Sequence, residues 1–359
     1  MKKKVCFLIG NISNSGGTER VSSLIANNLN KKKYQVYIIT IFNQSGPFFD
    51  LNKDIKIYTL YENNVSIYKN FLAICFKIRK IIKKNNIDIL VNVDSILAMF
   101  TIPSLLGLKT RNIIWEHFNF NVDLGVKFRK VIRFAAALLS NDIIVLTKKD
   151  KMFWEKAYPW CNKVIQIANP NPFDGVQIDA KINNKVLLSV GHLLDIKGFD
   201  YLLRAWAIVH IQRQDWTLRI VGSGPKKEEL ESLAQELKIT NIQWVESTKD
   251  IAQYYLSSAV YALSSHSEGL PMVLIEASSF GLPMVSFDCD TGPSDIITPS
   301  CGWLVMPLNI DDLAAKLLQA FDLFDSNEKY SVYSQASIDN AKRFTLENIL
   351  SRWDTLLNE

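Results

Sequence analysis

Two glutamates, Glu268 and Glu276, stand eight residues apart in the segment SSHSEGLPMVLIEASSFGLP at 264–283. Gly269 and Pro271 lie between them, and an apolar helical pattern follows. Proline is favoured at the first helical position, because the amide hydrogen it lacks would have no partner there. The sequence therefore predicts a loop that ends at Pro271 and directs the free amides of a new helix toward an anion such as phosphate.

The start of this predicted helix separates the two carboxylates. Glu268 precedes the helix, and Glu276 lies about one and a half turns inside it. The catalytic carboxylates of a glycosidase face each other across roughly 5–10 Å, so the helix start disfavours a glycosidase. We expect the two side chains to contact different parts of one ligand.

A loop with adjacent glycines follows the first apolar run of the chain. It reads NISNSGGTER at 11–20, where Gly16 and Gly17 would let a ligand approach the backbone closely. The dinucleotide fingerprint needs three spaced glycines, so this loop does not match it. The segment favours a loop that admits a phosphate or a sugar, and an ordinary strand-to-helix turn is the alternative.

A lysine beside a glycine marks a second loop, VGHLLDIKGFD at 190–200. A compact, rotatable ammonium group such as that of Lys197 suits the mobile oxygens of a diphosphate. The simpler interpretation is an exposed lysine on a surface turn. A third segment, IVGSGPKKEEL at 220–230, has Lys227 where a dinucleotide fingerprint needs glycine, and it favours a structural turn.

His117 ends a predicted strand in IIWEHFNF at 113–120, flanked by Glu116 and Asn119. Imidazole is the side chain best matched to proton transfer near neutral pH. His117 is therefore a candidate for that work, and a hydrogen-bonded structural histidine is the alternative. No metal site is predicted, because the remaining histidines lack the spacing of metal ligands: His192, His210 and His266.

Short apolar runs alternate with helical patterns along the chain, which predicts parallel sheets covered by helices on both faces. Strands are expected first at 4–10, 35–42, 87–93, 112–116 and 142–147, and then at 186–191, 216–221, 242–245, 259–263, 283–287 and 302–305. Helical patterns are expected at 19–30, 68–85, 96–106, 126–139 and 330–357. The chain is thus expected to have an α/β fold in which the alternation occurs twice.

A chain of 359 residues is too long for one ordinary core, so two domains are expected. The segment IANPNPFDG at 167–175 is rich in proline and asparagine and indicates a hinge. We expect two Rossmann-like, doubly wound domains at 1–167 and 168–335. A C-terminal helix at 336–359 is expected to cross back to the first domain.

Charge divides unevenly between the two predicted domains. Residues 1–167 hold 26 Lys and Arg against 11 Asp and Glu, a net +15, and the remainder holds 15 against 25, a net −10. The stretches KIRKIIKK at 77–84 and KFRKVIRF at 127–134 mix cations with apolar residues at helical spacing. They indicate either solvated helix faces or docking on an anionic membrane surface. Nucleic acid is disfavoured, because no nucleic-acid-binding motif appears in the sequence.

The cellular location is expected to be the cytoplasm. The start MKKKVCFLIG is charged, but its apolar run is too short for an export signal. Five cysteines have no paired spacing, which fits a reducing compartment. No run is long enough to span a membrane, so we expect a peripheral protein on the inner face of the cytoplasmic membrane.

Taken together, these segments resemble the retaining glycosyltransferases of family 4, bacterial polysaccharide and O-antigen enzymes included. That family has the GT-B fold of two Rossmann-like domains facing across a cleft. The resemblance spans nearly the whole chain: the GGTER loop, His117, the glycine–lysine–glycine segment, the two glutamates and GPSDI follow in the family's order and spacing. The glutamate pair around Gly-Leu-Pro is its most specific part.

The resemblance implies roles for the matching residues of the second domain. Glu276 would hold the ribose hydroxyls of a nucleotide, and Glu268 would contact the donor sugar. Lys197 would neutralise the diphosphate leaving group, with help from the amides of Gly269 and Leu270.

In the first domain, the resemblance implies that Gly16 and Gly17 admit the phosphates. His117 would lie near the donor sugar, which makes it a catalytic residue together with Glu268 and Lys197. The family commonly has arginine where this chain has His192. Either Lys197 therefore carries more of the diphosphate charge, or His192 supplies a hydrogen-bond donor.

The activity that the resemblance implies is a hexosyltransferase reaction with retention at the anomeric carbon. The donor would be a nucleotide sugar, usually of uridine or guanosine diphosphate, and UDP-linked galactose, glucose or an N-acetylhexosamine is expected here.

Neither a metal nor another cofactor is expected, although Asp288 and Asp290 resemble the Asp-x-Asp metal motif of another glycosyltransferase class. Gly292 and Ser294 in TGPSDI either line the phosphates or form a plain turn. The acceptor would be a lipid-linked or membrane-anchored saccharide.

Two other functions fit the same sequence features. A nucleotide-sugar epimerase of the same fold would need no acceptor. A two-domain protein that binds a sugar or nucleotide without chemistry would explain the hinge, but not the charged groups gathered around one predicted diphosphate site.

Overall fold

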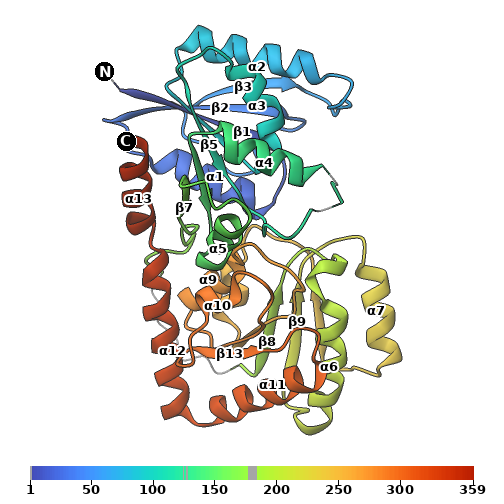
Figure 1. Ribbon diagram of the computed structural model, residues 1–359. Coiled ribbons are helices and arrows are strands. Elements are labelled where there is room, and N and C mark those ends of the chain that lie inside the picture. Colours follow the sequence, from blue (N-terminus) through green and yellow to red (C-terminus); the bar gives the residue numbers. More distant parts are fainter. Residues whose placement is uncertain (1, 124, 127, 177–183) are drawn as a thin grey trace. The chain divides into compact units, whose positions relative to one another are not determined.

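A computed structural model describes residues 2–123, 125–126, 128–176 and 184–359. Lys127, in one of the two basic stretches, lies outside the described residues. The chain forms two compact units. Unit 1 comprises Met1–Pro170 and Leu346–Glu359, and unit 2 comprises Asn171–Thr345. The C-terminal segment of the chain is thus part of the same unit as the N-terminal strands (Figure 1).

Unit 1 is built on a parallel sheet of seven strands in the order β3-β2-β1-β4-β5-β6-β7. The central strands are buried apolar runs, as expected for a parallel sheet covered on both faces. The strands are β1 (Lys3–Asn11), β2 (Tyr34–Phe42), β3 (Lys56–Tyr61), β4 (Ile89–Val93), β5 (Arg111–Trp115), β6 (Asp142–Val145) and β7 (Val164–Gln166).

Helices cover both faces of the unit 1 sheet, because alternate residues of each strand point to opposite faces. On β1, Cys6 and Leu8 pack into a cluster with α2 and α3, whereas Phe7 contacts Trp353 of the C-terminal helix. Figure 1 shows α3 between α2 and α4, and α3 packs against both. The helices of unit 1 are α1 (Gly17–Asn28), α2 (Phe71–Asn85), α3 (Ala98–Leu105), α4 (Arg129–Leu139), α5 (Lys148–Ala157) and α13 (Leu346–Asn358), with the 3-10 turn η1 (Ser95–Leu97).

Unit 2 has a parallel sheet of six strands in the order β10-β9-β8-β11-β12-β13. The strand order reverses between β8 and β11, and in open α/β sheets ligands bind beyond the carboxyl ends of the strands at such a switch point. The strands are β8 (Val186–Val190), β9 (Thr217–Val221), β10 (Ile242–Val245), β11 (Val260–Leu263), β12 (Met284–Phe287) and β13 (Gly302–Val305).

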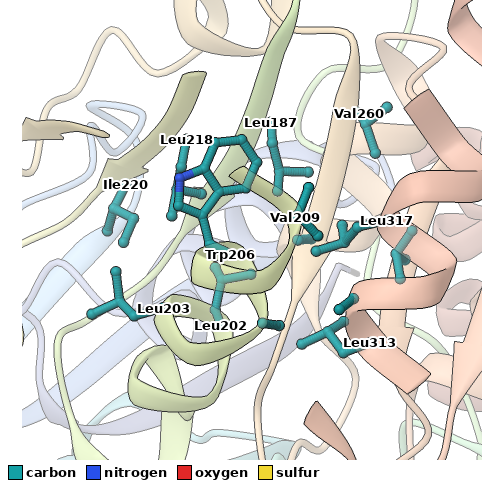
Figure 2. Close-up of a cluster of buried hydrophobic side chains, with 14 of the residues drawn as sticks. Leu187, Leu202, Leu203, Trp206, Val209, Leu218, Ile220, Val260, Leu313 and Leu317 are labelled. Atoms are coloured by element: carbon teal, nitrogen blue, oxygen red, sulfur yellow. The ribbon is translucent and has the colours of Figure 1, made fainter. Parts of the chain in front are cut away.

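One face of this second sheet carries the main apolar core of unit 2. Figure 2 shows Trp206 of α6 beside Leu187 and Leu218 of the sheet, in one cluster with Leu313 and Leu317 of α11. The opposite face carries α9 and α12. The helices are α6 (Phe199–Gln212), α7 (Lys227–Glu236), α8 (Ala252–Leu256), α9 (Met272–Ser279), α10 (Pro293–Ile296), α11 (Ile310–Asp325) and α12 (Asn327–Ala341), with the 3-10 turns η2 (Asp195–Lys197) and η3 (Lys342–Phe344).

The two parallel-sheet, Rossmann-like folds confirm the predicted α/β class. Of the strands, β3 and β7 at the two edges of the first sheet were missing from the prediction. Among the described residues, no helix is both long and apolar enough to cross a bilayer.

Candidate active site

An ion pair joins two of the predicted site residues of unit 2. Lys197 ends η2, after β8, and Glu268 lies in the loop after β11. The Nζ atom of Lys197 lies 2.7 Å from Oε1 of Glu268, and the two side chains are 26% and 10% exposed. A charge-assisted hydrogen bond this short and this sheltered holds both groups in defined positions. Lys197 is therefore not the exposed surface lysine of the simpler interpretation.

The backbone around Lys197 requires the neighbouring glycine. Gly198 has φ +60°, and a Cβ atom there would lie 2.1 Å from the carbonyl oxygen of Ser264 and 2.7 Å from Nε2 of His266. Ser264 Oγ donates to the Lys197 carbonyl at 3.1 Å, and the His266 amide donates to Ile196 at 2.9 Å. The turn that carries Lys197 is thus joined directly to the segment that leads to Glu268.

Glu276 is the fifth residue of α9 and is only 3% exposed. The hydroxyl of Tyr255 donates to its Oε2 atom at 2.8 Å. Tyr255 itself is buried and stacks on Phe280 at 5.2 Å between ring centroids. The Glu276 carboxylate is therefore fixed by a rigid aromatic neighbour, which suits a group that must accept hydrogen bonds at a set position.

The two glutamates bind different partners, but their charges act on one side chain. Burial raises the pKa of the Tyr261 hydroxyl well above its usual value, and the charges of Glu276 and Glu268 raise it further. Tyr261 lies on β11 and bonds to the backbone of Val190. Both carboxylates therefore lie near the Tyr261 hydroxyl, beside the switch in strand order. Each has its own partner, because Glu268 is paired with Lys197 and Glu276 accepts from Tyr255.

The Gly-Leu-Pro loop is packed against the turn before α10. Gly292 has φ +101°, and a Cβ atom there would lie 2.4 Å from Cδ of Pro271. The hydroxyl of Thr291 also donates to the Glu268 carbonyl. The TGPSDI turn thus supports the loop, and Ser294, the second residue of α10, is exposed.

Pro271 is the N-cap of α9 rather than its first residue, with φ −70° and ψ 105°, and the helix begins at Met272. The predicted position was wrong by one residue, because ψ at Pro271 is extended rather than helical. In the described part of the chain, no hydrogen bond uses the amides of Gly269 or Leu270. These amides precede a helix start, where the helix dipole favours an anion.

His192 is exposed in the loop after β8. The glycines of the third segment pack beneath this loop. A Cβ atom at Gly222 would lie 1.9 Å from the carbonyl oxygen of Gly191, and one at Gly224 would lie 2.5 Å from that of Leu193. Close packing therefore accounts for the Gly-x-Gly turn at 222–224.

His117 is buried at the carboxyl end of β5 in unit 1. It is 7% exposed, and its ring lies 4.5 Å from that of Trp115. Burial lowers the pKa of His117 to about 4, and the charge of Asp94 opposes this shift. Among the described residues, its Nε2 atom has no hydrogen-bond partner. The ring is therefore neutral near pH 7, and its part in proton transfer stays a prediction from the sequence.

The residue next to His117 is the centre of a buried ionic cluster. Glu116 accepts hydrogen bonds from Ser95 Oγ at 2.5 Å and from Arg133 Nε at 3.0 Å. Burial raises the pKa of Glu116, and the nearby arginine charges oppose that shift. Arg133 also donates to the carbonyls of Asn119 and Val122, both at 3.1 Å. The cluster therefore fixes the segment that follows His117.

Asp94 completes this cluster at the end of β4. It has the unusual φ of +103°. Its two carboxylate oxygens accept hydrogen bonds from the two terminal nitrogens of Arg129, at 2.7 and 3.1 Å. Such backbone conformations are strained for a residue with a side chain. Arg129 is 3% and Arg133 is 1% exposed, so the surface interpretation of the basic stretch at 127–134 was wrong for these two residues.

Gly16 and Gly17 lie at the start of α1, with Gly16 as its N-cap. A Cβ atom at Gly16 would lie 2.6 Å from Oε2 of Glu19. Burial raises the pKa of that Glu19 carboxyl. The structure thus places the loop where the sequence predicted it.

The described residues show no grouping of three or more His, Cys, Asp or Glu side chains suited to a metal ion. Asp288 is partly buried and Asp290 is exposed, so the two have different environments.

Solved structures of the same fold define the class. The lipopolysaccharide outer core galactosyltransferase WaaB superimposes with a TM-score of 0.77, at 22% identity and 99% coverage of both chains. Anabaena HepE in complex with UDP and glucose gives 0.80, at 16% identity and 99% coverage of both chains. The two Rossmann-like folds are therefore those of the GT-B class of folds.

Sequence comparison identifies the family. Residues 175–337 match the family described as "Glycosyl transferases group 1". An uncharacterized glycosyltransferase of Haemophilus influenzae is 37% identical over 99% of this chain and 100% of its own length. The amylovoran biosynthesis glycosyltransferase AmsD of Erwinia amylovora is 32% identical over 99% of each chain. The chain belongs to the group 1 glycosyltransferase family and is a glycosyltransferase, as predicted.

A third relative has a named acceptor. It is the Campylobacter jejuni GalNAc-alpha-(1->4)-GalNAc-alpha-(1->3)-diNAcBac-PP-undecaprenol alpha-1,4-N-acetyl-D-galactosaminyltransferase, 28% identical over 99% of this chain and 98% of its own. The relatives of this chain thus include enzymes of bacterial polysaccharide assembly.

Proposed function

We propose that the protein transfers a hexose or an N-acetylhexosamine from a UDP-sugar to a lipid-linked saccharide, with retention at the anomeric carbon. The reaction would serve the assembly of a cell-surface polysaccharide such as O-antigen, capsule or exopolysaccharide. The observation that carries the proposal is the sheltered Lys197–Glu268 pair, next to the free amides before α9.

The donor assignment rests on the chemistry of three side chains in unit 2. An ammonium group has three donors, and one of those on Lys197 binds Glu268, so two remain for phosphate oxygens. Glu268 has a second oxygen with which to accept a sugar hydroxyl, and Glu276, which is held by Tyr255, would accept hydrogen bonds from the ribose hydroxyls. HepE was solved with UDP and glucose, which supports a UDP-sugar.

In the proposed mechanism, negative charge grows on the diphosphate oxygen as the bond to the anomeric carbon breaks. Lys197 and the amides of Gly269 and Leu270 stabilise that charge, and preorganised donors of this kind are usually the largest catalytic contribution. The acceptor hydroxyl attacks from the leaving-group side, and its proton passes to the departing phosphate. No metal is required. A role for Gly16, Gly17 and His117 in the same reaction stays a prediction from the family resemblance.

The proposed acceptor and location rest on a relative and on charge. The Campylobacter relative acts on an undecaprenol-linked saccharide. The net charge of +15 on residues 1–167 would favour the anionic inner face of the cytoplasmic membrane. We therefore expect a peripheral enzyme at that face.

The test is to incubate the protein with a panel of nucleotide sugars, with and without extracted lipid-linked saccharides and with EDTA. We expect nucleoside diphosphate release that depends on acceptor, continues in EDTA and gives a product with the α-linkage of an α-linked donor. Donor converted to an isomer without acceptor would indicate an epimerase instead. Binding without turnover of any donor would indicate a non-catalytic binding protein.

A further inference from the structure

Helix α4 is amphipathic in the opposite sense to an ordinary surface helix. Its buried face carries Arg129 and Arg133, which are 3% and 1% exposed. Its outer face carries Val131, Phe134 and Leu138, which are 66%, 49% and 53% exposed. Water normally faces the charged side of a helix, so this outer face is suited to an apolar environment.

The buried ion pairs explain why α4 cannot rotate to cover its apolar side. Arg129 binds both oxygens of Asp94, and Arg133 binds Glu116 and backbone carbonyls. Breaking such buried pairs would leave charges without partners, which is strongly unfavourable. The apolar side chains are therefore held outward by the interior of the unit.

An aromatic side chain beyond α5 extends this apolar surface. The ring of Phe134 lies 6.0 Å from that of Tyr158 and 6.1 Å from that of Trp160, and Trp160 is 53% exposed. We call this surface the apolar ridge; it consists of Val131, Phe134, Leu138, Leu139 and Trp160. Tryptophan and tyrosine are enriched where proteins meet the interface between bilayer and water.

Helices α2, α3 and α4 carry positive charge and no negative charge, and on the neighbouring α5 the exposed Glu155 is paired with Lys151 at 3.6 Å. On α2, Lys77 binds the Leu60 carbonyl and Arg79 binds the Ser104 carbonyl, so these two cations are engaged within the unit. The exposed cations of α2 and α4 are Lys80, Lys83, Lys84 and Lys130.

This combination of charge and apolar surface selects the partner. A second copy of the chain docked through the same face would bring like charges together, which disfavours self-association. An anionic bilayer offers negative headgroups to the lysines and an apolar interior to the ridge. We infer that the apolar ridge inserts into the surface of an anionic lipid bilayer while the lysines of α2 contact the headgroups.

The inference deepens the proposed function, because it specifies the surface by which the protein would reach a lipid-linked acceptor. It also differs from docking by charge alone. High salt screens the lysines but not the ridge, so part of the binding should persist in salt.

The experiment compares two triple variants of the full chain in sedimentation with vesicles. The ridge variant is Val131→Ser, Leu138→Ser and Trp160→Ser. The control variant, Ile211→Ser, Met306→Ser and Val332→Ser, changes side chains of unit 2 that are 76%, 66% and 63% exposed. Vesicles of phosphatidylcholine with phosphatidylglycerol are compared with phosphatidylcholine alone, at low and at high salt.

We expect the ridge variant to bind anionic vesicles at least about tenfold more weakly than the wild type, and to lose its remaining binding in high salt. The control variant should bind like the wild type. Equal binding by the ridge variant and the wild type would overturn the inference. A change from dimer to monomer in the ridge variant, without an effect on vesicle binding, would also overturn it and would identify self-association.

A second measurement does not depend on the triple variant. Leu138→Cys and, as control, Ile211→Cys each carry an environment-sensitive fluorophore, because the native cysteines are all buried. A blue shift with anionic vesicles is expected at position 138 only, and no shift there would contradict insertion. Release of nucleoside diphosphate with a soluble acceptor should be unchanged in the ridge variant. Failure of sugar transfer and failure of membrane insertion are therefore separate results.

Discussion

Lys197 is the residue on which the proposed chemistry depends most, because it is the cation paired with Glu268, the residue directly before the amides of Gly269 and Leu270. We expect Lys197→Ala to lower kcat/KM by about 10²–10³-fold, as removal of one preorganised donor to a developing anion does in other enzymes. Steady-state assays of nucleoside diphosphate release measure the effect.

Two matched variants accompany this prediction. Lys227→Ala removes a lysine of the same unit that is paired with Glu246 at the surface, and it should stay within about twofold of the wild type. His192→Arg restores the cation common in the family at an exposed position and should also retain activity. Near-normal turnover of Lys197→Ala would show that the diphosphate is bound elsewhere.

His117 makes unit 1 sensitive to acid. Its pKa of about 4 lies below the usual value of about 6.5 for an unfolded chain. Between these values the unfolded chain binds the additional proton, so the free energy of unfolding falls as the pH drops from 6.5 toward 4. The loss at pH 5 amounts to about 2 kcal/mol.

Between pH 7.5 and pH 5, we therefore expect the free energy of unfolding of unit 1 to fall by about 2 kcal/mol less in His117→Asn than in the wild type. Urea unfolding of unit 1, followed at both pH values, provides the measurement. An unchanged pH dependence in the variant would mean that His117 is readily protonated in the folded protein.

Residue types and spacing select Lys197, Glu268 and Glu276 as candidate site residues, and the loop and helix start between the two glutamates are readable from the sequence. The pairing of Lys197 with Glu268 spans 71 residues and depends on how two strand ends meet. Arg129 and Arg133 were misassigned for a related reason. Two arginines four apart fit a solvated helix face equally well, and only their distant partners Asp94 and Glu116 place them inside.

At the scale of elements, the turn that ends η2 determines whether Lys197 and Glu268 meet. We expect Gly198→Ala to destabilise unit 2 and to abolish donor binding, because the added Cβ would lie 2.1 Å from the Ser264 carbonyl oxygen. Denaturant unfolding and titration with UDP measure the two effects.

Gly175→Ala is the matched control for this change. Gly175 also has a positive φ, of +79°, but none of the residues that the structure describes lies within 4 Å of an added Cβ atom. Gly175→Ala should lower the free energy of unfolding only by the cost of the left-handed backbone, about 1–2 kcal/mol. UDP binding should be intact. Equal effects of the two substitutions would mean that backbone strain, rather than the close contact, governs the turn.

The central strands of both sheets were predictable because they are continuous apolar runs. The two missed strands, β3 and β7, are the edges of the first sheet. Strand β3 (KIYTLY) is largely exposed, and β7 has only three residues. Edge strands have one open side and need no continuous apolar run, so their sequences carry little signal. Pairing with β2 and with β6 makes them strands.

At the scale of the whole molecule, the last helix stabilises the first unit. Trp353 of α13 is fully buried, and its ring lies 6.1 Å from that of Phe7 and 4.8 Å from that of Trp115. We expect Trp353→Ala to lower the stability of unit 1 by about 3–5 kcal/mol and to leave unit 2 unchanged. Calorimetry that separates the two transitions is the measurement.

Val332→Ala on α12, where the side chain is 63% exposed, is the control and should change neither transition. Loss of stability in both units of Trp353→Ala would show that they unfold as one.

The position of α13 also has a consequence for the order of events on the ribosome. Domains usually fold in the order of their synthesis, but unit 1 contains both the first strand and the last helix of the chain. Asn171–Thr345 is fully synthesised before Trp353 exists. Unit 2 can therefore reach its final fold first, while the N-terminal sheet, whose seven strands are already synthesised, still lacks α13. A nascent chain that is stalled or cut before Leu346 would consequently fail to complete unit 1, which contains the N-terminal strands, whereas unit 2 could still fold.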